Sequence, residues 1–282
     1  MKTLTTFLVA AAAVAAVGGL SSAADAAVST IWTDSASFGP PVLQEYDLSG
    51  NLLKTISAPH GSNGRGVVQV GNIVYYTSAS TNGVYAYNFV TDTDLGTVFT
   101  VPGASGLATM AYDGSHFFLG DYSGTNNVYE YTVGGTLVNT IPLSNCASFC
   151  DGLEFANGHL VSNRYDGGFG GANTYDVYST TGTLLTPNFI VGQNASGNTG
   201  IAFDGTFYYV SNVFSGTLGR YDSSGHWLND ITLTGTVGDV EDLSVNYVQV
   251  LGVPEPATWG LMLIGFGGLG AALRSRRKLA AA

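Results

Sequence analysis

The segment Tyr46-Asp47-Leu48-Ser49-Gly50-Asn51-Leu52-Leu53 returns late in the chain as Tyr221-Asp222-Ser223-Ser224-Gly225-His226-Trp227-Leu228. Tyrosines recur at positions 46, 87, 131, 178 and 221, with spacings of 41, 44, 47 and 43 residues. Four of them are followed by a glycine four residues later. A period of about 44 residues is the length of one four-stranded propeller blade. The repeat therefore predicts a β-propeller.

Tight turns divide each repeat further. The stretch Met110 to Phe118, with Asp113-Gly114 at its middle, matches Ile201 to Tyr209, with Asp204-Gly205 at its middle. Asp-Gly pairs flanked by alternating apolar residues are typical of hairpins that join two strands. Each unit is thus expected to contain four strands and no helix, which predicts an all-β fold.

The two ends of the repeat region complement each other. The segment from Ile31 begins at the second strand of a unit, whereas Gly238 to Tyr247 supplies a first strand and then stops. We expect the N- and C-terminal segments to share one blade, which closes the ring without a free edge. Counting that blade, the sequence predicts five four-stranded blades.

Composition supports one all-β domain and excludes nucleic acid as a partner. The chain has 282 residues, 39 glycines, 10% charged residues and a formal net charge of −11. Residues 28–253 are enough to bury a large core, and we assign them to the propeller domain. The basic residues in this range are few and scattered: Lys54, Arg65, Arg164 and Arg220. They cannot neutralise a track of phosphates.

The N-terminal 27 residues have the pattern of a secretory signal peptide. Met1-Lys2 is followed by an apolar stretch from Phe7 to Leu20 and then by small residues before Val28. The apolar stretch is shorter than the roughly 20 residues of a membrane-spanning helix. We expect residues 1–27 to be removed on export, and a retained helix is the alternative.

The C-terminal segment has three parts. Pro254-Glu255-Pro256 precedes an apolar stretch from Ala257 to Leu273 that contains Trp259, and a basic cluster follows, formed by Arg274, Arg276, Arg277 and Lys278. As a helix the apolar stretch would be about 26 Å long, just enough to cross a bilayer core. We therefore expect a single C-terminal transmembrane helix. The basic cluster would stay in the cytoplasm, with the domain on the outer side of the membrane.

This arrangement resembles the PEP-CTERM sorting signal of exported proteins from Gram-negative bacteria that make exopolysaccharide. The resemblance covers residues 254–278, leaves 279–282 as a short tail, and departs from the pattern at Ser275 within the basic cluster. It implies an exosortase-type membrane protease as partner, cleavage near Pro254 to Pro256, and passage from the inner membrane to the cell surface or matrix. A permanent C-terminal anchor is the alternative.

Oxygen-bearing side chains are expected to gather at one mouth of the central channel. In successive units Asp34, Ser78, Asp121, Asn163 and Asn212 end the second strand. Near the starts of first strands come Asp151, Glu154, Asp239, Glu241 and Asp242. These residues would suit Ca²⁺, which takes six to eight oxygen ligands, and lactonase-like propellers place a metal in this way. The alternative is that Asp and Asn only close turns.

The remaining motifs are few. Cys146 and Cys150, in an exported protein, favour a local disulfide over metal binding. The sequence contains neither a Gly-x-Ser-x-Gly elbow nor a His-Glu-x-x-His motif.

Two functions fit these observations. The favoured one is a non-catalytic propeller that binds exopolysaccharide or another envelope component through its many aromatic residues. The alternative is a Ca²⁺-dependent lactonase, hydrolase or lyase with its site at the acidic mouth.

Overall fold

The structure is a computed structural model that describes residues 30–36, 39–122, 124–146, 150–164, 174–193 and 197–247. In this part of the chain all regular elements are strands, and no helix is long and apolar enough to span a membrane. The predicted signal peptide and the predicted sorting signal with its transmembrane helix lie outside the described residues.

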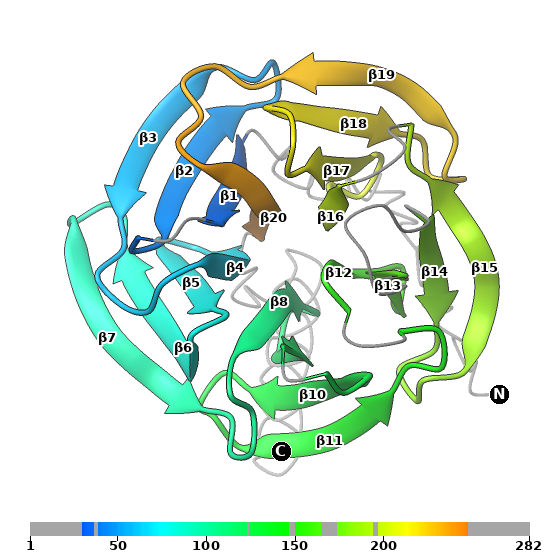
Figure 1. Ribbon diagram of the computed structural model, residues 1–282, viewed down its shortest axis with the longest axis horizontal. Coiled ribbons are helices and arrows are strands. Elements are labelled where there is room, and N and C mark those ends of the chain that lie inside the picture. Colours follow the sequence, from blue (N-terminus) through cyan, green and yellow to red (C-terminus); the bar gives the residue numbers. More distant parts are fainter. Residues whose placement is uncertain are drawn as a thin grey trace, which may run out of the picture. The chain divides into compact units, whose positions relative to one another are not determined.

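The strands form five four-stranded antiparallel blades around a centre (Figure 1). From the centre outward, the first blade contains β20 (Asp239–Tyr247), β1 (Thr30–Ala36), β2 (Val42–Asp47) and β3 (Leu52–Ser57). The second contains β4 (Gly64–Val70), β5 (Ile73–Ser78), β6 (Thr81–Asn88) and β7 (Thr93–Thr100). The third contains β8 (Leu107–Tyr112), β9 (His116–Asp121), β10 (Asn127–Thr132) and β11 (Leu137–Pro142).

The last two blades follow the same plan. The fourth contains β12 (Leu153–Ala156), β13 (His159–Asn163), β14 (Thr174–Tyr178) and β15 (Leu184–Val191). The fifth contains β16 (Asn198–Phe203), β17 (Tyr208–Asn212), β18 (Thr217–Tyr221) and β19 (Trp227–Thr232). The predicted five-bladed, all-β propeller is confirmed.

The shared first blade closes the ring as the sequence predicts. The C-terminal strand β20 is its innermost strand and pairs antiparallel with β1, from Ile31 opposite Val245 to Ala36 opposite Asp239. Near its end β20 also pairs in parallel with β4 of the second blade. Figure 1 shows β20 lying between β1 and β4 at the centre. Both chain segments are thus held in one blade, and the edge that either would expose alone is covered.

Apolar side chains form a core between each pair of adjacent blades. Five clusters of buried residues occur, and each draws its members from two neighbouring blades. Four of the repeated tyrosines, at 46, 131, 178 and 221, are at most 3% exposed in these clusters. A fully buried aromatic side chain contributes about 1.5–3 kcal/mol by burial alone. The tyrosine repeat is therefore a packing repeat.

The glycines that follow these tyrosines have a packing reason of their own. Gly50, Gly182 and Gly225 adopt φ angles of 87°, 84° and 80°. A Cβ at these positions would lie 2.1–2.3 Å from a backbone oxygen in the outer strand of the preceding blade. The turn therefore needs a residue that tolerates a positive φ and has no side chain. In the second blade, which lacks this glycine, Phe89 instead packs on Trp32 of the first blade, with ring centroids 5.2 Å apart.

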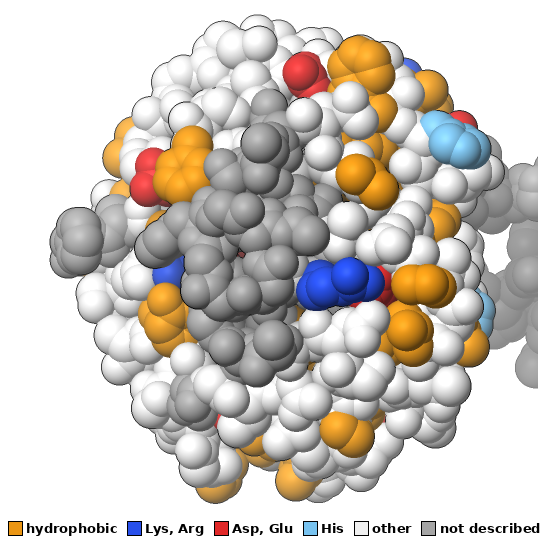
Figure 2. Space-filling view, turned by 45° about the vertical axis from the view of Figure 1, so that its right-hand side comes forward, with side chains coloured by type: hydrophobic (Ala, Val, Ile, Leu, Met, Phe, Trp, Pro, Cys, Tyr) orange, Lys and Arg blue, Asp and Glu red, His pale blue; other side chains and the backbone are white. Residues whose placement is uncertain are grey.

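The outer strands carry most of the exposed large hydrophobic side chains. They include Leu53, Leu95, Leu137, Leu185 and Trp227, one from each outer strand. Figure 2 shows one face of the molecule, on which hydrophobic side chains lie in small separate groups among polar ones. On this face the outer strands do not present one continuous apolar patch.

Candidate functional site

Most of the predicted strand-end residues lie where the sequence places them. Ser78, Asp121, Asn163 and Asn212 are the last residues of the second strands β5, β9, β13 and β17. Asp34 lies two residues before the end of β1, the second strand of the shared blade. All five side chains are buried.

Two of these side chains bind their own loops. The Oδ2 atom of Asp121 accepts a hydrogen bond from the Thr125 hydroxyl at 3.0 Å. The Oδ1 atom of Asn212 accepts one from the backbone N–H of Phe214 at 2.9 Å. These contacts fit the turn-closing role that the sequence left open as the alternative to metal binding.

Asn163 and Glu154 tie chain segments together in the fourth blade. Asn163 Oδ1 accepts hydrogen bonds from the backbone N–H groups of Asp151 and Gly152, at 2.9 and 3.0 Å. Glu154 Oε2 accepts one from the backbone N–H of Phe203 in the fifth blade, at 3.2 Å. Glu154 therefore links the fourth and fifth blades through a hydrogen bond to its Oε2 atom.

An arginine occupies the centre of the ring. Arg65, on the innermost strand β4, is only 9% exposed, and its Nη1 atom forms ion pairs with Glu241 of β20 and with Asp151, the latter at 3.4 Å. Its Nη2 atom donates to the Tyr122 hydroxyl at 3.1 Å, and its Cζ lies 4.6 Å from the centre of that ring. One guanidinium thus contacts residues from the first, third and fourth blades.

Burial and the ion pairs have opposite effects on the pKa values of Arg65 and Asp151. Burial alone would lower the pKa of Arg65, but Glu241 and Asp151 outweigh it and raise the pKa. Burial raises the pKa of Asp151, and Arg65 offsets part of that rise. The pKa of Glu241 lies well above its usual value because of burial and the nearby Asp151. A guanidinium between two carboxylates is what keeps such buried charges tolerable.

Two further carboxyl groups are buried next to this ion pair. Asp34 and Asp242 are opposite one another on β1 and β20, and both are 0% exposed. Asp242 Oδ2 accepts hydrogen bonds from the backbone N–H groups of Val67 and Met110, both at 3.3 Å. Among the residues that the structure describes, no donor reaches hydrogen-bonding geometry with either oxygen of Asp34, although the backbone N–H groups of Ser35 and Arg65 lie nearby. Burial therefore holds the pKa of both groups well above the usual value.

Two of the predicted calcium ligands are engaged by the arginine. Glu241 and Asp151, two of the predicted ligands, already contact Arg65. Within the described ranges, no three of the predicted acidic ligands bring their oxygens within 4.8 Å of one another. Both oxygens of Asp34 and the Oδ1 atom of Asp242 have no hydrogen-bond partner among the described residues, whereas Asp242 Oδ2 accepts three hydrogen bonds, from Val67, Met110 and Thr109. Calcium binding therefore stays a prediction. An ion at the centre would have to take its oxygen ligands from around Asp34 and Asp242.

Arg65 is the central residue that sequence reasoning missed. The sequence shows it only as one of four scattered basic residues. The available signal was its position in Gly64-Arg65-Gly66, at the start of a first strand, where the other units carry acidic, polar or small side chains. Both glycines are required by the close approach of neighbouring blades, since a Cβ on Gly64 would lie 2.0 Å from an Asp34 oxygen.

Cys146 and Cys150 form a disulfide bond, with Cα atoms 5.4 Å apart. Both are 2% exposed. The bond closes a short loop directly before Asp151. It therefore constrains the segment that presents Asp151 to Arg65.

Asp239, another predicted ligand, is exposed, whereas Glu241 and Asp242 of the same strand are buried. It lines a shallow hollow formed by the loop after β17 and the start of β20. The lining residues are Val213, Phe214, Ser215, Gly216, Gly238, Asp239 and Val240. Phe214 is 59% exposed there. The hollow combines an aromatic ring, a hydroxyl and a carboxylate in an open position.

Comparison with known proteins identifies the C-terminal segment. Residues 252–278 match the PEP-CTERM protein-sorting motif. The motif marks an exported protein that is anchored in the membrane before an exosortase, a membrane protease, processes it. A comparison with curated protein sequences finds no match.

Comparison with solved structures supports the fold alone. A chain of the nidogen/laminin complex is 11% identical with a TM-score of 0.56, over 78% of this chain and 99% of that chain. The computationally designed Ika8 protein is 16% identical with a TM-score of 0.41, over 76% of each chain. The designed Ika4 protein is 20% identical with a TM-score of 0.39, over 58% of this chain and 92% of that one. The chain is thus an exported β-propeller with a C-terminal sorting motif.

Proposed function

We propose that this protein is a non-catalytic binding propeller that is delivered to the cell surface or extracellular matrix, where it binds exopolysaccharide. The sorting motif at residues 252–278 carries this proposal, because such a motif marks an exported protein and it lies shortly after the last strand of the ring, which ends at Tyr247. In this proposal residues 1–27 are removed on export. The chain is held in the inner membrane by its C-terminal helix, and an exosortase cleaves it near Pro254 to Pro256.

The hollow beside β20 is the proposed binding site. Aromatic side chains pack on the apolar faces of sugar rings, and the Phe214 side chain at this hollow is 59% exposed. Ser215 and Asp239, which line the same hollow, can donate and accept hydrogen bonds to sugar hydroxyls. An open, shallow site suits a segment of a long polymer better than it suits a small enclosed substrate.

The arrangement at the centre favours binding over catalysis. A metal-dependent hydrolase, lactonase or lyase would need carboxylates that are free to bind the ion and the substrate. Glu241 and Asp151 instead neutralise Arg65 and are each at most 5% exposed. Their contacts hold blades together.

Processing is tested by replacing Pro254-Glu255-Pro256 with alanines in an exosortase-bearing host. We expect the parent protein to appear at the surface or in the medium, without Arg274 to Lys278, by mass spectrometry. The variant should stay in the inner membrane at full mass, because its helix and basic cluster are unchanged. A parent protein that retains Arg274 to Lys278 would replace this proposal with a permanent anchor.

Binding is tested by cosedimentation with exopolysaccharide purified from the same host. Phe214→Ala should weaken retention by about three- to tenfold, the loss of one aromatic contact. Trp227→Ala is the matched control, since Trp227 is 44% exposed but lies on the outer strand β19, away from the hollow. Equal losses in the two variants would show that the hollow is not the site.

A further inference from the structure

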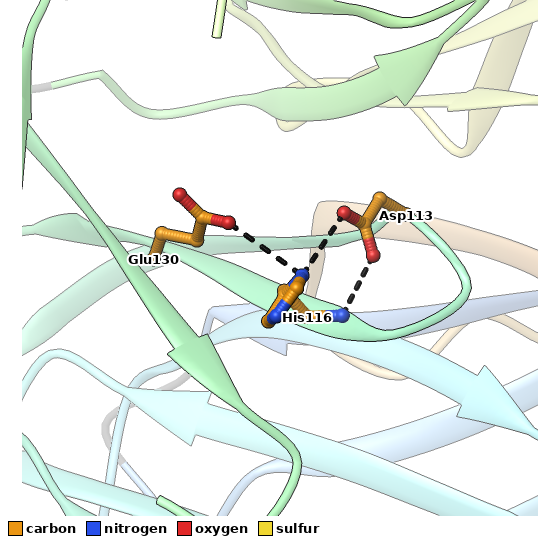
Figure 3. Close-up of side chains that lie close together, drawn as sticks. All are labelled: Asp113, His116 and Glu130. Atoms are coloured by element: carbon orange, nitrogen blue, oxygen red, sulfur yellow. Dashed lines mark hydrogen bonds and ion pairs between the residues drawn. The ribbon is translucent and has the colours of Figure 1, made fainter. Parts of the chain in front are cut away.

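A cluster of three potential metal ligands lies on the third blade, apart from the centre and from the hollow. Asp113 lies in the turn between β8 and β9, and His116 is the first residue of β9. Glu130 lies on β10 opposite Phe118, two residues beyond His116 and on the same face. Figure 3 shows the three side chains converging.

The imidazole of His116 faces more acceptors than it can satisfy. Its Nδ1 atom lies 3.3 Å from Asp113 Oδ2, 3.5 Å from Glu130 Oε1 and 3.1 Å from the Ser115 hydroxyl. One ring nitrogen carries at most one hydrogen, so it can donate to only one of the two carboxylates. The carboxylates meanwhile repel each other, because one oxygen of each lies within 4.8 Å of the other. A cation shared by all three groups would remove both problems.

The fifth blade shows that the fold does not require this cluster. Its matching turn holds Asp204 in the same way: Oδ1 accepts backbone N–H groups at 2.7 and 2.6 Å, as Asp113 Oδ1 does in the third blade. The position of His116 is taken by Phe207 and that of Glu130 by Arg220, whose Cζ lies 4.3 Å from the centre of the Phe207 ring. The backbone is therefore stable with an uncharged ring and a cation at these positions.

The remaining oxygen of the turn aspartate differs as well. Asp204 Oδ2 accepts a hydrogen bond from the Tyr209 hydroxyl at 2.8 Å. The corresponding residue of the third blade is Phe118, which has no hydroxyl, and Asp113 Oδ2 faces the His116 ring instead. Near the turn aspartate, the fifth blade thus has a tyrosine hydroxyl and a cation, whereas the third blade has an imidazole and a second carboxylate.

We propose that Asp113, His116 and Glu130 bind one divalent transition-metal ion of the zinc type. Zinc bonds of 2.0–2.2 Å in a tetrahedron separate neighbouring ligand atoms by about 3.3 Å, close to the 3.3 and 3.5 Å between Nδ1 and the two carboxylates. Imidazole with carboxylates suits zinc and its neighbours in the first transition row. Three protein ligands leave the fourth position for water. The side chains are 16–30% exposed, so an ion can enter from solution.

The test titrates Co²⁺ and then Zn²⁺ into the full chain, purified in detergent without a polyhistidine tag. We expect one equivalent of Co²⁺ to give the visible absorption bands of a tetrahedral site, and Zn²⁺ to displace it. His116→Phe introduces the residue of the fifth blade and should weaken binding by more than about tenfold. Glu130→Gln, which keeps the size of the side chain, should weaken it as well.

His226→Phe is the matched control. Its Nδ1 lies 3.3 Å from Asp222 Oδ2, the same distance as in the cluster, but it has no second carboxylate partner among the described residues. The control should bind Co²⁺ like the parent. The proposal is overturned if the parent shows no tetrahedral Co²⁺ spectrum. It is equally overturned if circular dichroism shows folded His116→Phe and Glu130→Gln variants that bind as tightly as the parent, or if the control loses binding to the same extent.

Discussion

Adjacent blades are held together differently at the rim of the ring, formed by the two outer strands of each blade and the turns between them, and at its centre, formed by the innermost strands. At the rim, four blades repeat one device, a buried tyrosine followed by a glycine turn. At the centre there is no such repeat, and the single arginine Arg65 contacts carboxylates from two other blades. The rim contacts therefore repeat from blade to blade, whereas the central contacts do not.

The pKa values of carboxyl groups also differ between the rim and the centre. At the rim, Asp47 is solvated and accepts hydrogen bonds from Asn51 and Ser49, which lower its pKa. At the centre, burial raises the pKa of Asp34 and Asp242 well above the usual value. The same residue type is stabilised as an anion in one region and as a neutral acid in the other.

The strongest test of this contrast removes the central cation. Arg65→Met should lower the free energy of unfolding by about 3–5 kcal/mol, because Glu241 and Asp151 would remain buried without a counter-charge. Urea denaturation of the full chain measures the change. Adding Glu241→Gln to Arg65→Met should restore part of the loss. If the free energy of unfolding of Arg65→Met alone lies within about 1 kcal/mol of the parent value, the ion pairs of Arg65 do not stabilise the centre.

The second test breaks the rim. Gly182→Ala should cost about 2–3 kcal/mol, because alanine is strained at φ 84° and its Cβ would lie 2.3 Å from the Pro142 oxygen. Gly158→Ala is the control, since its φ is 81° but no atom lies within 4 Å of the added Cβ. It should cost about 1–2 kcal/mol. Equal costs would show that crowding by the preceding blade contributes nothing.

The third test compares the two kinds of carboxyl group by pH. Because the folded-state pKa of Asp34 is raised, its contribution to stability is present at low pH and is lost as pH rises through that pKa. Asp34→Asn cannot ionise, so it should be more stable than the parent at pH 7 by about 1 kcal/mol and should flatten the pH dependence.

Asp47→Asn provides the opposite case. Its lowered folded-state pKa means that stability is lost as pH falls through that pKa, so this variant should differ most from the parent near neutral pH, where Asp47 is ionised. The measurement is the free energy of unfolding between pH 3 and pH 8. If Ca²⁺ raises the stability of the parent at pH 7 but not that of Asp34→Asn, then Asp34 binds the ion as an anion.

The sequence contained most of the fold because the rim devices are local. A tyrosine, a glycine four residues later and an Asp-Gly turn all lie within one unit, so their recurrence could be counted. The closing strand was also predictable, since Gly238 to Tyr247 completes a unit that begins at Ile31.

The candidate sites could be predicted only in part, because their contacts join distant units. Arg65 meets Glu241 across 176 positions and Asp151 across 86, and no spacing rule links them. Asn163 lies at a strand end as predicted, but its hydrogen bonds to Asp151 and Gly152 depend on how the segment before β12 folds in the same blade. His116 and Glu130 become neighbours only once β9 and β10 pair in register.

The position of β20 gives the domain a particular mechanical behaviour. Tension on residues beyond Tyr247 enters the ring through its innermost strand, along the strand axis. The hydrogen bonds from β20 to β1, between the pairs Ile31–Val245 and Ala36–Asp239, then share the load in shear instead of opening one at a time. A pulling force on the C-terminal segment is therefore resisted by the folded ring. The propeller domain stays folded and cannot follow its C-terminal segment into a narrow passage.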